Sequence, residues 1–225
     1  MKGKSCRIAI VLLALLLFTL PARAISLGQI DTFQDGTTMN WGNGPFAPPI
    51  INFNTGGPGG AGDRYIQMTA DGSGPGGRLT IFNVDQWAGN FIAAGVTTLE
   101  IDLNNQSAVS LSIRIAFKSQ ISQDSPGYLS APMFLPANSG WQHFSISITA
   151  ANVVAVGGPT AYNTFFTAVA EMRIIHEVGT ANLNGDPVTG ALGIDNIRAV
   201  PEPTVTALGI IGLLGFAALR LRKRR

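Results

Sequence analysis

A strict alternation of apolar and polar side chains over residues 111–118 is the feature that most constrains the fold of this chain. Leucine, isoleucine, isoleucine and phenylalanine take every second position, with serine, arginine, alanine and lysine between them. Because successive side chains of a β-strand point to opposite faces, this pattern predicts a strand with one buried face. The segment 99–103 repeats the pattern, with three aliphatic residues against a glutamate and an aspartate.

The β pattern continues along most of the chain between residues 25 and 199. Further strands are expected at 64–69, 78–84, 128–135, 141–148, 170–176 and 192–200. Only 149–155 and 164–169 have a helical pattern, and both are short. Short strands separated by Gly, Pro, Asn and Ser predict an all-β fold, a jelly-roll β-sandwich in one domain.

Two loops, 54–63 and 70–77, are unusually rich in glycine, and each contains Gly-Pro-Gly-Gly. A phosphate-binding loop needs a helix directly after its glycines, and both loops lead into predicted strands instead. We therefore expect wide turns with positive φ angles rather than a nucleotide site.

Both ends of the chain have the composition of targeting signals. Residues 1–24 combine a basic start, an apolar core and an Ala-Arg-Ala cleavage site, which predicts a signal peptide and a mature chain beginning at Ile25. Residues 200–225 contain Pro201-Glu202-Pro203, an uncharged segment 204–219 and a basic tail 220–225. As a helix, 204–219 would span about 24 Å of a roughly 30 Å hydrocarbon core, which predicts a single transmembrane helix with a cytoplasmic tail.

The order of Pro-Glu-Pro motif, apolar helix and arginine-rich end resembles the PEP-CTERM sorting signal of Gram-negative bacteria that produce exopolysaccharide. With the signal peptide, the resemblance implies export through the Sec translocon and a transient anchor in the inner membrane. It further implies removal of the tail by a membrane-embedded exosortase. The expected destination is the cell surface or the extracellular matrix.

The charge of the domain differs from that of the whole chain. The formal net charge of the chain is +2, but residues 25–199 hold six basic and 12 acidic side chains, a formal charge of −6. A net negative domain without a basic cluster argues against nucleic acid as a partner. Cys6, the only cysteine, lies within the predicted signal peptide, so the exported domain is expected to have no disulfide.

The two ends of the domain look like those of galactose-binding-like and carbohydrate-binding jelly-roll modules. The residues concerned are Ile30 to Thr38, with Trp41 soon after, and Leu192 to Arg198. The resemblance implies that the first and last strands lie close together and share a structural calcium ion. Asp195 takes the position that usually supplies a carboxylate there, whereas Gln34 stands where a glutamate is common.

The residues themselves also point to calcium. Asp31, Asp35 and Asp195 are short carboxylates beside turns, and calcium takes six to eight oxygen ligands of this kind. The apolar phase changes around Asp195-Asn196, which predicts a β-bulge. The alternative for Asp195 is an Asx turn that closes the final strand.

Two aromatic residues are candidates for stacking on a sugar ring. Trp87 follows the polar pair Asp85-Gln86 in a loop and is the first candidate for exposure, and Tyr128, directly after Pro126-Gly127, is the second. The alternative is that each supports the fold.

Catalysis has little support in the sequence. His143 and His176 lie within strand patterns as expected surface or cross-strand residues, and no serine-hydrolase or metalloprotease motif occurs. Glu171 and Glu177 could form a carboxylate pair only if the fold placed them at a suitable distance. The sequence therefore predicts a protein that is not an enzyme and binds extracellular polysaccharide or a matrix protein. The alternatives are a secreted glycan-acting hydrolase and a purely structural matrix protein.

Overall fold

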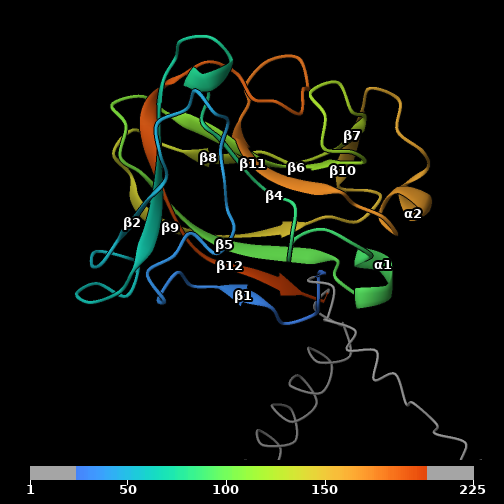
Figure 1. Cartoon of the computed structure of the whole chain (residues 1–225), viewed down its shortest axis with the longest axis horizontal. Coiled ribbons are helices and arrows are strands. Elements are labelled where there is room, and N and C mark those ends of the chain that lie inside the picture. The colour runs from blue at the N-terminus through green and yellow to red at the C-terminus, as the bar shows by residue number, and fades with distance from the viewer. Residues whose placement is uncertain (1–23, 202–225) are drawn as a thin grey trace, which may run out of the picture.

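The computed structural model describes residues 24–201, which form two antiparallel sheets packed face to face (Figure 1). The predicted transmembrane helix, basic tail and most of the signal peptide lie outside these residues, as do Glu202 and Pro203. Within 24–201, no helix has the length and apolar character that a membrane crossing requires.

Sheet A has six strands in the order β2-β3-β12-β5-β9, and β1 pairs with the end of β12. Their bounds are β1 (Ile30–Asp31), β2 (Ile51–Phe53), β3 (Tyr65–Asp71), β5 (Thr98–Asn105), β9 (Gly140–Ser147) and β12 (Thr189–Val200). The pairing of β1 with β12 confirms that the first and last strands lie side by side.

Sheet B also has six strands, in the order β10-β7-β6-β11-β4, with β8 paired to β6. Their bounds are β4 (Thr80–Asn83), β6 (Leu111–Lys118), β7 (Gly127–Ser130), β8 (Met133–Leu135), β10 (Val153–Val156) and β11 (Glu171–His176). The chain passes repeatedly from one sheet to the other, so the architecture is a jelly-roll-like β-sandwich and the all-β prediction is confirmed.

The core lies between the sheets and follows the predicted alternation. Leu111, Ile113, Ile115 and Phe117 of β6 are all buried, and each contributes roughly 1.5–3 kcal/mol of transfer free energy. A second, smaller apolar cluster on the outer face of sheet B joins Ala116, Leu129 and Ile175 to Leu183 of the loop before β12. This loop explains why β11 is buried along its whole length.

The helical pattern at 149–155 was misleading. Its last residues begin β10, which pairs with β7. The helices are single turns: α1 (Phe91–Ala94), α2 (Tyr162–Phe165) and the 3-10 turn η1 (Pro75–Gly77). Of the segment 164–169, only the start is helical, because α2 ends at Phe165. The first glycine loop forms turns with positive φ at Gly56, Gly60 and Gly62, as expected.

The predicted bulge is present in β12. The register with β5 shifts between Asp195 and Arg198, and Asn196 has a φ of 50°. The shift lets Ile194 and Ile197 both face the core although they are an odd number of residues apart.

Candidate functional site

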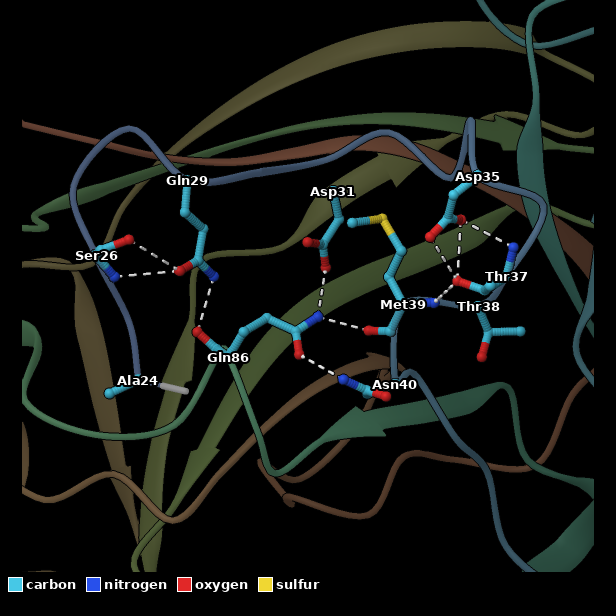
Figure 2. Close-up of a pocket in the computed structure, with 10 residues that line it drawn as sticks. All are labelled: Ala24, Ser26, Gln29, Asp31, Asp35, Thr37, Thr38, Met39, Asn40 and Gln86. Carbon is cyan, nitrogen blue, oxygen red and sulfur yellow. Dashed lines mark hydrogen bonds between the residues drawn. The ribbon is translucent and has the colours of Figure 1, made fainter. Parts of the chain in front are cut away.

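A polar pocket of about 780 Å³ opens beside β1 (Figure 2). It is lined by residues just before β1, by the segment 35–40 after it, and by Gln86 from the loop that follows β4. Hydroxyl, amide and carboxylate groups dominate the lining, and none of the described lining residues is Lys, Arg or His. Its volume is within the usual range for small-molecule sites.

Asp31 forms the inner wall of this pocket. Its side chain is buried, and its Oδ2 atom accepts hydrogen bonds from Trp41 Nε1 at 2.8 Å, Trp87 Nε1 at 2.7 Å and Gln86 Nε2 at 3.1 Å. Burial raises the pKa of Asp31, although these three bonds act in the opposite direction. Among residues 24–201, no group donates to Oδ1, which points away from Gln86 (Figure 2). Oδ1 is therefore a positioned acceptor for a ligand.

Gln86 connects the parts of the lining. Its Nε2 atom also donates to the Met39 carbonyl oxygen at 2.5 Å, and its Oε1 atom accepts from Asn40 Nδ2 at 3.3 Å. Its backbone carbonyl accepts from Gln29 Nε2 at 2.8 Å. Through its side chain and its backbone carbonyl, this one residue thus contacts the segments on both sides of β1 around the pocket (Figure 2).

The backbone of this wall has an unusual conformation. Phe33, Met39 and Asn40 have φ angles of 57°, 48° and 61°, in the left-handed region that non-glycine residues seldom adopt. Between them, Asp35 closes a turn by accepting from the backbone N and the hydroxyl of Thr37, both at 2.9 Å. Residues in such conformations cost energy and are concentrated at binding sites, where the surrounding structure holds them in place.

The chemistry of the pocket suits a neutral ligand with many hydroxyl groups. Carboxylate oxygens accept hydrogen bonds from hydroxyls, and amide side chains both accept and donate them. Two carboxylates without a basic residue in the lining disfavour an anion.

The exposure predicted for Trp87 and Tyr128 is wrong. Trp87 is fully buried, because the loop after β4 turns so that Gln86 faces the pocket while the indole packs 6.4 Å from that of Trp41. Tyr128 is also buried, and its hydroxyl donates to the Thr160 carbonyl while its ring packs against Phe165. Neither ring is available to stack on a sugar.

The three carboxylates predicted for calcium do not fit one shared ion. Asp31 and Asp35 line the same pocket. Asp31 pairs with the core residue Ile197 and so faces the core side of sheet A, whereas Asp195 pairs with Asp102 on the outer face of that sheet. Asp31 Oδ2 is already occupied by three N–H donors. Over residues 24–201, no group of three or more His, Cys, Asp or Glu side chains is close enough to hold a metal.

The glutamates considered for catalysis are each engaged by an arginine. Glu171 accepts from Arg173 Nε at 2.6 Å, and Glu177 lies 2.7 Å from Arg114 Nε. His143 forms the expected cross-strand contact, 2.8 Å from Asp102, and its side chain is 58% exposed. His176 is buried instead, and its Nδ1 accepts from the backbone N of Ser112.

Sequence reasoning missed an aromatic group on the outer face of sheet A. Tyr65 packs 5.2 Å from Phe53 on one side and 5.2 Å from Trp141 on the other. Trp141 Nε1 donates to the Gly56 carbonyl, which ties the first glycine loop to the sheet. The Trp141 ring packs directly over Gly193. A Cβ atom added at Gly193 would lie only 3.2 Å from that ring, so a larger residue there would crowd it.

Comparison with known proteins gives similarities of structure only. No protein-family model matches the chain, and no curated protein is similar in sequence. An exo-beta-agarase structure superposes with a TM-score of 0.52 and 12% identity, over 79% of this chain and 26% of the agarase chain. The family 11 carbohydrate-binding module from Clostridium thermocellum gives a TM-score of 0.46 and 14% identity, over 78% of this chain and 97% of the module. CBM28, a carbohydrate-binding module specific for non-crystalline cellulose, gives a TM-score of 0.46 and 13% identity, over 80% of this chain and 99% of the module.

Proposed function

We propose that this protein is an exported, non-catalytic module that binds neutral polysaccharide in the pocket beside Asp31. The observation that carries the proposal is the Asp31 carboxylate in the pocket lining, with one oxygen fixed by three donors and the other without a donor among the described residues. An acceptor whose position is set before binding loses little entropy when a sugar hydroxyl donates to it. The amide of Gln86 and the carboxylate of Asp35 would provide further contacts.

The non-catalytic part of the proposal rests on the carboxylates. A glycosidase needs an acid and a base or nucleophile that both reach the substrate. Glu171 and Glu177 are buried against arginines on sheet B, away from the pocket. In the pocket, the two carboxylates both have structural hydrogen bonds: Asp31 Oδ2 accepts from three N–H donors, and Asp35 closes a turn with Thr37.

The export route is also part of the proposal, and the limits of the domain support it. Ile25, the predicted first mature residue, is buried in the core and its backbone N donates to the Ala88 carbonyl at 2.8 Å. At the other end, β12 finishes at Val200, directly before the sorting motif that begins at Pro201. Cleavage at both signals would therefore leave both sheets intact. Exosortase and the inner membrane would be transient partners, and the destination the cell surface or extracellular matrix.

A glycan array probed with the purified protein tests the proposed function. We expect binding to neutral oligosaccharides and no release of reducing ends during prolonged incubation. Turnover of any glycan would favour the secreted hydrolase. A complete lack of glycan binding would favour a structural matrix protein.

A further inference from the structure

A second pocket lies on the outer face of sheet B and has a different chemistry. Its volume is about 60 Å³, and its lining includes the side chains of Arg78, Arg173, Phe82 and Asn184. Phe82 of β4 and Arg173 of β11 are cross-strand partners on this face. The pocket is therefore separate from the one beside Asp31, which no arginine lines.

Arg173 is held in place with one nitrogen unused. Its Nε donates to Glu171 at 2.6 Å and its Nη1 to Asn184 Oδ1 at 2.8 Å, while its guanidinium carbon lies 5.7 Å from the centre of the Phe82 ring. No hydrogen bond joins Nη2 to any residue within 24–201. These contacts fix the orientation of the guanidinium and leave one edge for a ligand.

Arg78 has no anionic partner. It forms no ion pair with any residue that the structure describes, and its Nε atom is buried without a hydrogen-bond partner. A buried donor that is left unpaired destabilises the fold, so an acceptor supplied by a ligand would offset that cost.

Cations exceed anions around this second pocket. Lys118 is buried nearby, where its Nζ contacts only neutral oxygens, those of Gln123 and Asn184, at 3.2 and 3.4 Å. Burial, followed by the charge of Arg173, lowers the pKa of Lys118 to about 8, although Glu171 and Asp124 act in the opposite direction. The three basic side chains of this region, Arg78, Lys118 and Arg173, thus outnumber its two acidic ones, Glu171 and Asp124.

We infer that the space between Arg78 and Arg173 binds the oxyanion of an acidic glycan, a carboxylate or a sulfate. A volume of about 60 Å³ holds about two water molecules, which matches such a group and excludes a sugar ring. The sugar ring would lie outside this pocket, against Phe46, which is 88% exposed and directly precedes lining residue Ala47. The backbone of Phe46 packs against Gly76, which lines the pocket. A Cβ atom added at Gly76 would lie only 2.7 Å from the Phe46 carbonyl, so the two segments are in close contact.

The test is calorimetric titration of the purified protein with oligogalacturonate, sulfated dextran oligomers and neutral maltooligosaccharide. We expect at least one of the acidic ligands to bind, with an affinity that falls as sodium chloride is raised. Which of the two binds more tightly identifies the oxyanion. Arg78→Gln is expected to weaken that binding about tenfold or more, because it removes a charge-assisted contact.

Arg198→Gln is the matched control, since Arg198 is exposed on β12 in the other sheet. A second readout is the pKa of Lys118 measured by NMR, which should rise when the acidic ligand binds. Equal binding by wild type and Arg78→Gln, or no binding of either acidic ligand, would overturn the inference. Neutral glycan binding beside Asp31 should be unchanged in Arg78→Gln, so this inference and the proposed function can fail separately.

Discussion

Asp31 and Trp87 are 56 positions apart in the sequence, yet the indole Nε1 of Trp87 donates to the Asp31 carboxylate at 2.7 Å. The bond ties the first strand of sheet A to the loop that follows β4 of sheet B. It also places Gln86, the neighbour of Trp87, in the wall of the polar pocket. A structural interaction and a candidate binding site therefore share the same carboxylate.

Trp87→Phe is expected to destabilise the fold by about 1.5–3 kcal/mol, the usual value for a hydrogen bond to a charged group. Phenylalanine keeps most of the ring packing and removes the N–H donor. Urea unfolding followed by circular dichroism measures the effect. Trp141→Phe is the matched control, because its N–H donates to a neutral carbonyl near the surface and its loss should cost less. A cost for Trp87→Phe no greater than that of the control would contradict the role assigned to this bond.

The sequence pattern predicted the elements that carry a regular apolar face. The alternation of residues 111–118 corresponds to β6, and the change of phase near Asp195 marks the bulge of β12. The short strands β2 and β10 were not recognised, because three or four residues are too few to show a period, and β1 was expected only from the resemblance. Their positions depend on pairing with distant strands.

The pocket could be predicted only in part. Asp31 and Asp35 were singled out as calcium ligands, and both line the pocket. The loop around Trp87 was also singled out, with Trp87 as the exposed residue, whereas it is Gln86 that lines the pocket and Trp87 that is buried. A polar loop gives no local signal that its tryptophan turns inward, since the carboxylate that receives it is far away in the sequence.

Asp195 is expected to make stability depend on pH. Burial, with the nearby charges of Asp63 and Asp102, raises its pKa from 3.8 to about 7. The folded state then holds a proton that the unfolded state has released between about pH 4 and 7, so stability should fall as pH rises through this window. Asp195→Asn removes this titration but keeps an acceptor for the Asn196 backbone N.

Melting temperatures of Asp195→Asn and wild type should therefore be similar near pH 4.5 and diverge up to pH 7.5, with the variant more stable. Each kcal/mol corresponds to about 2–4 °C for a domain of this size. A difference that is constant across this range would assign the pH dependence to other groups.

Calcium is expected to leave the melting temperature unchanged. Asp31 and Asp195 lie on opposite faces of sheet A, and Asp31 Oδ2 already accepts three hydrogen bonds. Scanning calorimetry with EDTA and with millimolar calcium measures this directly. A rise of several degrees with calcium would show a site that involves other oxygens, since binding to the folded state stabilises it by mass action.

Export is expected to remove both ends of the chain. Mass spectrometry of the surface or secreted fraction should find a protein that begins at Ile25 and ends near Pro203. Deletion of 204–225 should abolish C-terminal processing without preventing translocation. Recovery of the released protein with Arg225 intact would contradict processing by an exosortase.

The central claim, that the pocket beside Asp31 binds neutral polysaccharide, is tested most directly by the affinity of Asp35→Asn for the best neutral ligand from the array. Asparagine can still accept from Thr37, so the turn is kept while the charge-assisted contact to a sugar hydroxyl is lost. Asp71→Asn is the matched control, because Asp71 closes the same kind of turn with Ser73 outside the pocket. We predict a loss of about tenfold in calorimetric affinity for Asp35→Asn and none for Asp71→Asn. Equal affinities for wild type and both variants would contradict the claim.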